Sequence, residues 1–328
     1  MTSAPPHGSL RHILAVCGPG PEHSDTLATA LRLARTHQAK LTVLGVIELP
    51  SDHLALGRRA GISPAELTQR LANDLRDDLH AMVRLMAPDQ SPQCTVRTGK
   101  PFLEVIHHVI EHQVDLVMKA ADPFGGLHSH LFSSTDQHLL RKCPCPVWLR
   151  RNGTSSKTRA IVAAVDLDAP GQPGSGGQGG LNESIVDIAL KIASGEDATV
   201  HVLHVWDAPG AGLLRLWSDE PDPTAAQARY EMAIKAEHMK ALDRLIAGRE
   251  QLIGELRKGV ARHVIPARVR ALGAELLVMG TIARTGIPGF IIGNTAEDII
   301  NSVECALLTV KPPGYESPVA PVRAASAS

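Results

Sequence analysis

The sequence predicts an α/β fold made of two tandem, doubly wound parallel-sheet domains. Two observations lead there: the 328-residue chain repeats itself, and short aliphatic runs alternate with amphipathic helical segments in each half. A run such as "AIVAAV" at 160–165 is apolar without alternation, which is typical of a parallel strand buried on both faces. Strands that alternate with helices in this way form a doubly wound sheet.

The repeat is visible when the two halves are compared directly. "RHILAVCGPG" from Arg11 resembles "RAIVAAVDLD" from Arg159, and each half is expected to run strand, helix, strand, long helix, short strand, helix, strand, loop, helix, strand. Cys17 is taken as the counterpart of Asp166, an offset of 149, and Ala34 as the counterpart of Ala193, an offset of 159, which implies ten extra residues in the second half. The stretch "GQPGSGGQGG" at 171–180 is interpreted as a lengthened loop, because its glycines lack the spacing of a phosphate cradle.

Domain boundaries follow from changes in composition. We expect a disordered N-terminus at 1–9, a first domain at 10–152, a second domain at 158–312 and a disordered tail at 313–328. The polar, turn-prone stretch at 150–157 links the two domains.

Helix starts are marked by capping residues. Ser63 is the expected N-cap of the first long helix, with Glu66 completing a capping box. The "SSTD" stretch at 133–136 is interpreted as a helix start with a serine or threonine cap, not as nucleophilic chemistry. Asn294 or Thr295 is expected to cap the last helix.

Composition excludes several classes of protein. The net charge of −1 and the 3 % of aromatic residues argue against a nucleic-acid-binding protein. No apolar run approaches the roughly 18 residues of a membrane span, and the N-terminus lacks the pattern of a secretory signal. Five scattered cysteines suit a reducing cytoplasm better than a disulfide framework, so a cytoplasmic protein is expected.

Two strand ends in the second half have the residues of a nucleotide site. Ligands of an open parallel sheet bind beyond the carboxyl ends of the strands, near the switch in strand order. The first strand ends at Asp166, whose carboxylate can accept from a base amine or a ribose hydroxyl. The fourth ends at Gly280, where glycines let backbone N–H groups approach a phosphate and the next helix N-terminus favours negative charge.

The stretch "GTIARTGIPGFIIGNTAE" at 280–297 resembles the universal stress protein family. Nucleotide-binding members of that family carry a Gly-x-x-Gly-x9-Gly-(Ser/Thr) loop after the fourth strand. Here Gly280 and Gly293 hold the first and third glycine positions, Ala283 replaces the middle glycine, and Asn294 stands at the last position. Together with "STDQHLLRKCPCPVW", this loop makes the chain, about residues 10 to 313, similar to the tandem, UspE-type members.

The resemblance implies a cytoplasmic stress-response protein whose two domains pack as an internal pseudo-dimer. It implies ATP or another adenine nucleotide as ligand, with no metal beyond a nucleotide-associated Mg²⁺. Asp166 would then lie near the adenine and ribose, and Val205 would touch the base. The residues implied to line the phosphates are Gly280, Gly293, Asn294 and Thr295. Ala283 departs from the pattern, because its methyl group disfavours any positive φ that the loop requires.

The first half has a degenerate version of this site. Cys17 replaces the acid, Lys119 replaces the first loop glycine, and Gly125 and Gly126 are adjacent rather than spaced. Although Lys119 could meet a phosphate directly, we expect this half to bind no nucleotide and to pack against the second. The last strands of both halves are candidates to pair at the seam, which leaves open a monomer with an internal pseudo-dimer or a homodimer.

Two histidine groups suggest metal binding, and each has a simpler interpretation. His108 and His112 have the i, i+4 spacing that zinc can bridge, but no zinc-protease motif surrounds them, so they are interpreted as solvent-facing helix residues. His128 and His130 are candidates for a site with the cysteines of "CPC" at 143–145. That motif is better explained as the start of the last core strand of its half.

Catalysis has no support in the sequence. There are no paired carboxylates, no triad order and no Walker lysine in the loop after Gly280. Slow ATP hydrolysis would need a water-positioning group, and none is identified. Met232, Met239 and Leu242 have helical spacing and are expected in a core or interface. The leading hypothesis is a ligand-binding or sensor module. The alternative is an interaction protein that binds a protein or hydrophobic small-molecule partner, for example in an aliphatic cleft between the halves.

Overall fold

A computed structural model describes residues 9–49, 61–122, 132–151, 157–167, 180–213, 222–281 and 293–319. The first half contains β1 (His12–Val16), the 3₁₀ turn η1 (Pro21–His23), α1 (Ser24–His37), β2 (Lys40–Ile47), α3 (Pro64–Met86), β3 (Gln93–Thr98), α4 (Pro101–His112), β4 (Leu116–Ala120), α5 (Ser134–Lys142) and β5 (Val147–Arg150). The second half contains β6 (Ala160–Val165), α6 (Leu181–Glu196), β7 (Thr199–Trp206), α8 (Pro223–Ile246), β8 (Leu252–Lys258), α9 (Ala261–Leu272), β9 (Leu276–Gly280), α10 (Asn294–Ser302) and β10 (Ala306–Val310). Each half shows the predicted order of strands and helices.

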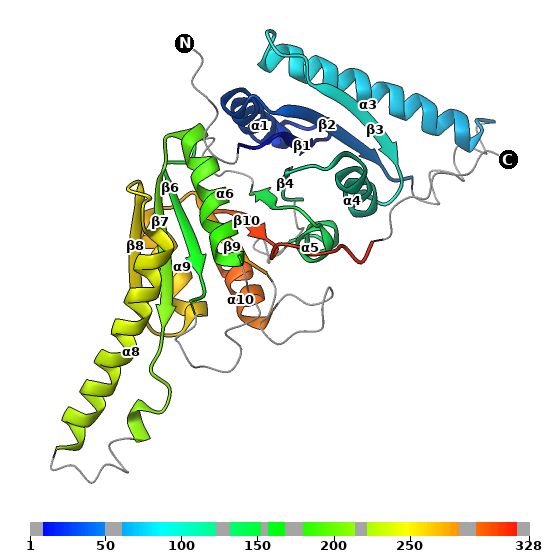
Figure 1. Cartoon of the computed structure of the whole chain (residues 1–328). Coiled ribbons are helices and arrows are strands. Elements are labelled where there is room, and N and C mark those ends of the chain that lie inside the picture. The colour runs from blue at the N-terminus through cyan, green and yellow to red at the C-terminus, as the bar shows by residue number, and fades with distance from the viewer. Residues whose placement is uncertain are drawn as a thin grey trace.

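The strands form one ten-stranded sheet in the order β3-β2-β1-β4-β5-β10-β9-β6-β7-β8 (Figure 1). Neighbouring strands within each half are parallel, as the continuous apolar runs predicted. The two halves meet where β5 pairs antiparallel with β10, with Trp148 opposite Leu308. The predicted pairing of the last strands is therefore present, and Trp148 is fully buried at this seam.

The sheet is buried on both faces because successive strand residues point to opposite sides. In β6, Ile161, Ala163 and Val165 belong to a core that includes residues of α1, α3, α6 and α8. Val162 and Ala164 belong to the opposite core, which includes residues of α4, α5, α9 and α10. A strand that contributes to both cores can be apolar along its whole length, as the "AIVAAV" run is.

The strand register corrects the alignment of the two halves by one residue. Ile13 pairs with Leu41 of β2, and Ile161 pairs with Val200 of β7. Equivalent residues therefore differ by 148 positions in the first strands and by 159 in the second, so the second half has eleven extra residues, not ten. They lie between β6 and α6, where residues 168–179 are outside the described part of the chain.

The corrected alignment changes which residue of the first half corresponds to Asp166. With an offset of 148, Cys17 is the equivalent of Val165 and Gly18 is the equivalent of Asp166. Cys17 is accordingly buried in the core rather than presented at the sheet edge, and burial raises its pKa to about 12. The first half therefore still lacks the acid, but glycine is the residue in its place.

Both helix caps predicted in the first half are confirmed. The Ser63 hydroxyl accepts a hydrogen bond from the Glu66 backbone N–H at 3.1 Å, at the start of α3. The Ser133 hydroxyl accepts from the Asp136 backbone N–H at 3.1 Å, at the start of α5. Each cap satisfies one of the N–H groups that the first helical turn leaves without an internal acceptor.

The segment that follows β10 is more ordered than its composition suggested. The tail was expected to be disordered from residue 313, but the chain is described as far as Val319. The Tyr315 hydroxyl donates to the Arg141 carbonyl at 2.9 Å, and the Ser317 hydroxyl donates to the Lys142 carbonyl at 2.7 Å. The last-turn carbonyls of α5 have no N–H partner inside the helix. The two hydroxyl groups supply the missing donors, and these bonds fix the segment against α5.

The apolar residues of α8 divide between the core and the surface. Leu242 is buried as expected, whereas Met232 is 71 % exposed and Met239 is 38 % exposed. Met232 and Met239 are therefore not core residues, and an interface position for them stays a prediction. The N-terminal end of α8 extends past the end of the sheet in Figure 1.

Candidate functional site

The candidate site lies where the strand order switches direction. β6 is flanked by β7 on one side and β9 on the other, so the chain leaves it at a topological switch point. Asp166 follows β6 directly, level with Val205 of β7 and next to the carboxyl end of β9, which is Gly280. These three residues, far apart in the sequence, therefore share one edge of the sheet.

The residues that flank the glycine loop are also brought to this edge. The Thr281 carbonyl accepts a hydrogen bond from the Gly293 backbone N–H at 3.3 Å. Because α10 begins at the next residue, Asn294, its N-terminus is tied to the end of β9. Ala283 and the rest of residues 282–292 lie outside the described part of the chain.

The N-cap of α10 is Gly293, so the expectation that Asn294 or Thr295 caps this helix is wrong. Both residues already belong to the first turn of the helix, where their side chains are exposed. Unlike α3 and α5, this helix has no side-chain cap within the described residues. The first-turn N–H groups of Asn294, Thr295 and Ala296 have no acceptor inside the helix, and such groups favour an anion.

Asn182 is a residue of this edge that the sequence did not single out. Its side-chain oxygen accepts from the Asp166 backbone N–H at 3.0 Å, and its amide donates to the Asp166 carbonyl at 2.9 Å. The paired bonds fix the backbone of Asp166 where β6 ends. Asp166 is exposed at this strand end. The available signal was an amide side chain in the first turn of the helix after the glycine-rich stretch.

Gly280 has a packing role in addition to its place in the motif. A β-carbon at this position would lie 2.9 Å from the Leu181 side chain, which is buried at the start of α6. The absence of a side chain therefore lets α6 approach the end of β9.

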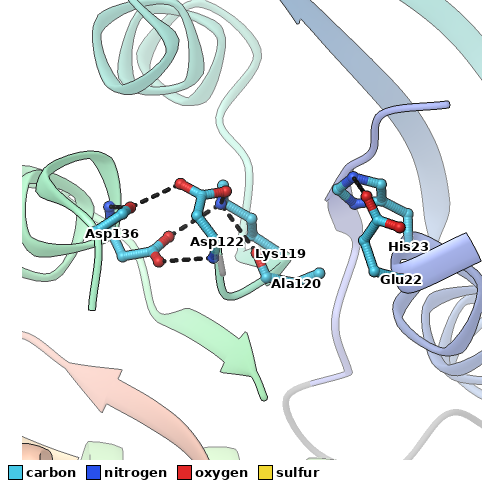
Figure 2. A network of polar contacts seen from close by, with 7 residues as sticks. Glu22, His23, Lys119, Ala120, Asp122 and Asp136 are labelled. Atoms are coloured by element: carbon cyan, nitrogen blue, oxygen red, sulfur yellow. Dashed lines mark hydrogen bonds and ion pairs between the residues drawn. The ribbon is translucent and has the colours of Figure 1, made fainter. Parts of the chain in front are cut away.

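The equivalent place in the first half is occupied by an ion-paired lysine (Figure 2). The register of β4 makes Lys119 the equivalent of Met279 and Ala120 the equivalent of Gly280, which corrects the sequence comparison by one residue. Lys119 is 5 % exposed, and its ammonium group contacts the carboxylates of Asp122 and Asp136, the latter at 3.0 Å. A lysine with two carboxylate partners is not available to a phosphate.

Asp136 is the fully buried member of this network. Its second oxygen accepts from the Asp122 backbone N–H at 3.0 Å, and Ser133 donates to the Asp122 carboxylate at 2.7 Å. Burial raises the pKa of Asp136, and the Lys119 ammonium opposes that rise. The N-terminus of α5 thus has a serine cap and a carboxylate, where α10 has Gly293 and Ala296.

Comparison with known proteins gives the family. The universal stress protein family model matches residues 9–151 and again residues 181–311. The chain belongs to the universal stress protein family. Universal stress protein E of Escherichia coli K12 is 34 % identical over 224 residues, covering 67 % of this chain and 68 % of that protein. The homolog of universal stress protein E from Haemophilus influenzae is 28 % identical over 311 residues, covering 92 % and 98 %.

Solved structures agree with the tandem arrangement. A functionally unknown protein from Pseudomonas aeruginosa PAO1 has a TM-score of 0.66 and 26 % identity, covering 92 % of this chain and 93 % of its own. A universal stress protein from Archaeoglobus fulgidus has a TM-score of 0.55 and 15 % identity, covering 92 % and 98 %, which is a likeness of fold. The chain is therefore a tandem, UspE-type universal stress protein, and this membership supports a role in the stress response.

The histidines of this universal stress protein differ from the sequence-based interpretation. His108 is 3 % exposed and packs against the His112 ring at 4.2 Å, so the prediction that it faces solvent is wrong for His108. Burial lowers the pKa of His108 to about 3, which keeps it neutral at physiological pH. No three His, Cys, Asp or Glu side chains in the described ranges are grouped to hold a metal ion. His128 and His130 lie outside those ranges.

The cysteines of this universal stress protein are all free thiols. Cys143 and Cys145 are buried with their sulfur atoms 3.7 Å apart, and they immediately precede β5. Cys305 precedes β10 in the same way. No described helix is apolar over enough residues to cross a membrane.

A pocket of about 380 Å³ lies between the two halves of this universal stress protein. Residues of α6 and of the segment after β10 line one side, and residues near the start of β1, β4 and β5 line the other. The walls include Ile188 and Val310 but also Asp115 and Lys191. The cleft is therefore mixed in polarity, not aliphatic as the sequence suggested.

Proposed function

We propose that the second half of this tandem universal stress protein binds an adenine nucleotide, with ATP as the candidate, and acts as a ligand-binding sensor in the stress response. One observation carries the proposal: Asp166, Val205 and Gly280 share the sheet edge at the switch point. The N-terminus of α10, which has no side-chain cap among the described residues, is bonded to the same edge. A carboxylate, an apolar contact and open backbone N–H groups are what a base, a ribose and phosphates need.

Each residue has a role in this proposal. The Asp166 carboxylate accepts from the base amine or a ribose hydroxyl, and Val205 packs against the base. The phosphates lie at Gly280, Gly293 and the first-turn N–H groups of Asn294 and Thr295. Bound ATP brings Mg²⁺, which neutralises phosphate charge. The proposal is for binding and does not include turnover.

Comparison of the two halves supports one nucleotide site per chain. In the first half the equivalent helix N-terminus is capped by Ser133 and lies next to the buried Asp136 carboxylate, which repels a phosphate. Lys119 is paired with Asp136 and Asp122. The first half thus serves as the structural partner in an internal pseudo-dimer, and a homodimer remains open to measurement. Five free cysteines suit a cytoplasmic protein.

The test is a titration of the purified protein with ATP by isothermal calorimetry. We expect one nucleotide per chain, and we expect Gly293→Val to abolish binding. Gly293 has φ −61° and ψ 142°, which valine adopts readily, so the loss reports obstruction by the side chain and not backbone strain. The control is Gly126→Val in the first half. Gly125 and Gly126 lie outside the described residues, and because no nucleotide is expected in this half, the change should leave affinity and stoichiometry unaltered. Unaltered affinity in Gly293→Val would count against the site.

The second candidate function is binding of an apolar ligand or a protein partner. The interdomain pocket of about 380 Å³ offers the space for a ligand, and its walls combine apolar residues such as Ile188 with the charged Asp115 and Lys191. Denaturing the purified protein and identifying released molecules by mass spectrometry separates the two. An adenine nucleotide supports the first proposal, and an apolar compound supports the second.

A further inference from the structure

We infer that Lys311 is a positioning residue for the second-half site, and that helix α5 of the first half is part of the site's framework. This inference rests on the proposed nucleotide binding and adds to it a dependence on the seam between the halves. Lys311 follows β10 directly, and its side-chain hydrogen bonds go to Leu140 and Thr281, neither of which is assigned to the ligand. Its influence on affinity would therefore pass through these residues.

The Lys311 ammonium joins two oxygen atoms from different halves. It donates to the Leu140 carbonyl in the last turn of α5 and to the hydroxyl of Thr281. The Thr281 hydroxyl lies 3.5 Å from the same Leu140 carbonyl. Thr281 is the residue that follows Gly280, and its own carbonyl accepts from the Gly293 N–H. Lys311 therefore fixes Thr281, which follows Gly280 at one end of the candidate loop and is hydrogen-bonded to Gly293 at the other.

Burying the Lys311 ammonium group between the two halves is energetically unfavourable. Lys311 is only 8 % exposed, and its hydrogen-bond partners in the described chain are two neutral oxygens. The ammonium also lies 5.5 Å from the centroid of the Tyr315 ring, which Tyr315→Phe would keep, and no carboxylate is paired with it in the described chain. Removing a charge from water without a counter-charge is unfavourable, whereas an apolar side chain of similar length would fill the site without that penalty. What the ammonium adds is a fixed position for the Leu140 and Thr281 oxygens.

A second contact links α5 to the start of α10. The Arg141 guanidinium lies 3.7 Å from the Glu297 carboxylate in the first turn of α10. The Glu297 N–H donates to the Gly293 carbonyl at 2.9 Å. The last turn of α5 therefore contacts both the end of β9 and the beginning of α10. A nucleotide that needs those two elements in one arrangement would bind more tightly when the seam holds them there, and binding would strengthen the seam in return.

The experiment measures ATP affinity in the full-length chain carrying Lys311→Met, Thr281→Val, both changes, or Tyr315→Phe. Tyr315→Phe is the matched control, because it removes a hydrogen bond to the neighbouring Arg141 carbonyl without touching Thr281. We expect Lys311→Met and Thr281→Val each to weaken ATP binding by about fivefold or more, in the range of typical coupling between sites. The double variant should lose little more than either single variant, because both remove the same interaction.

Hydrogen exchange of the peptide that contains Gly293 provides a readout without ligand. We expect faster exchange in Lys311→Met than in wild type or Tyr315→Phe. If wild type binds ATP and Lys311→Met binds it equally well with unchanged exchange, the inference is overturned and the proposed function stands. If wild type binds no ATP, the proposed function fails. Exchange then decides the positioning role: faster exchange supports it and unchanged exchange overturns it.

Discussion

Lys311 and Arg151 occupy equivalent positions in the two halves, and each donates a hydrogen bond to a helix of the opposite half. Lys311 reaches the Leu140 carbonyl of α5, and Arg151 reaches the Ile300 carbonyl of α10 at 3.1 Å. The two bonds flank the antiparallel pairing of β5 with β10. The residues differ in chemistry, since a guanidinium keeps its charge when buried, whereas a buried ammonium shifts its pKa readily.

Because Lys311 is buried, we expect the folding stability to change with pH in the alkaline range. Burial lowers its pKa from 10.5 to about 8 in the folded chain. Below pH 8 the ammonium is charged in both states, and its burial penalty is constant. Between pH 8 and 10.5 the unfolded chain keeps the proton that the folded chain has lost, so this group's contribution to folding stability rises with pH. The rise is about 3 kcal/mol at most, given the fall of the Lys311 pKa from 10.5 to about 8.

The measurement is urea unfolding of wild type and Lys311→Met at pH 7.5 and pH 10. Other groups also titrate in this window, so the quantity to compare is the difference in unfolding free energy between the two proteins. We expect the free energy of unfolding of wild type to increase relative to that of Lys311→Met as the pH rises. Parallel pH profiles would show that Lys311 is not perturbed.

The Lys119 network predicts a non-additive pair of substitutions. Lys119→Met leaves the buried Asp136 carboxylate without its cation, and breaking a buried ion pair in this way costs about 3–5 kcal/mol. Adding Asp136→Ala reproduces the Met279 and Ala296 pair of the second half and removes the uncompensated charge. We expect thermal unfolding of the double variant to return close to wild type. Additive losses would contradict this account.

Gly280 predicts a packing penalty that is independent of any ligand. Gly280→Ala should destabilise the protein by about 1–3 kcal/mol, the usual range for adding a methyl group to a filled core. Leu181→Val removes the atom that the new β-carbon would meet at 2.9 Å. In urea unfolding without nucleotide, we expect the double variant to lose less stability than the sum of the single variants. If the losses simply add, Leu181 is not the neighbour that requires glycine.

Local patterns were enough to predict the elements of the fold. Continuous aliphatic runs predicted strands buried on both faces, and the repeat predicted the order of elements that both halves show. The Ser63 and Ser133 caps were predictable because a cap depends on residues three apart in the chain. The seam between the last strands was also anticipated, and β5 pairs with β10 as expected.

Local patterns failed where a single residue of register mattered. A strand has period two, so an error of one residue changes which side chain faces which core. Setting Cys17 and Lys119 opposite Asp166 and Gly280 is an error of this size, because the register sets them opposite Val165 and Met279. The cap of α10 is Gly293 and not Asn294 or Thr295, and the Gly293 N–H donates to the Thr281 carbonyl, a contact across twelve positions that capping preferences do not predict.

The residue order thus contains the strands, the helices and the candidate loop, because hydrophobic period and capping act over a few neighbouring positions. Only the folded chain brings Lys311, Thr281 and Leu140 to one point, from segments separated by 30 and 171 positions. The hydrogen bonds between them depend on how β10 pairs with β5 and where α5 ends. Long-range contacts of this kind arise from packing the two halves together, and no local signal in the sequence records them.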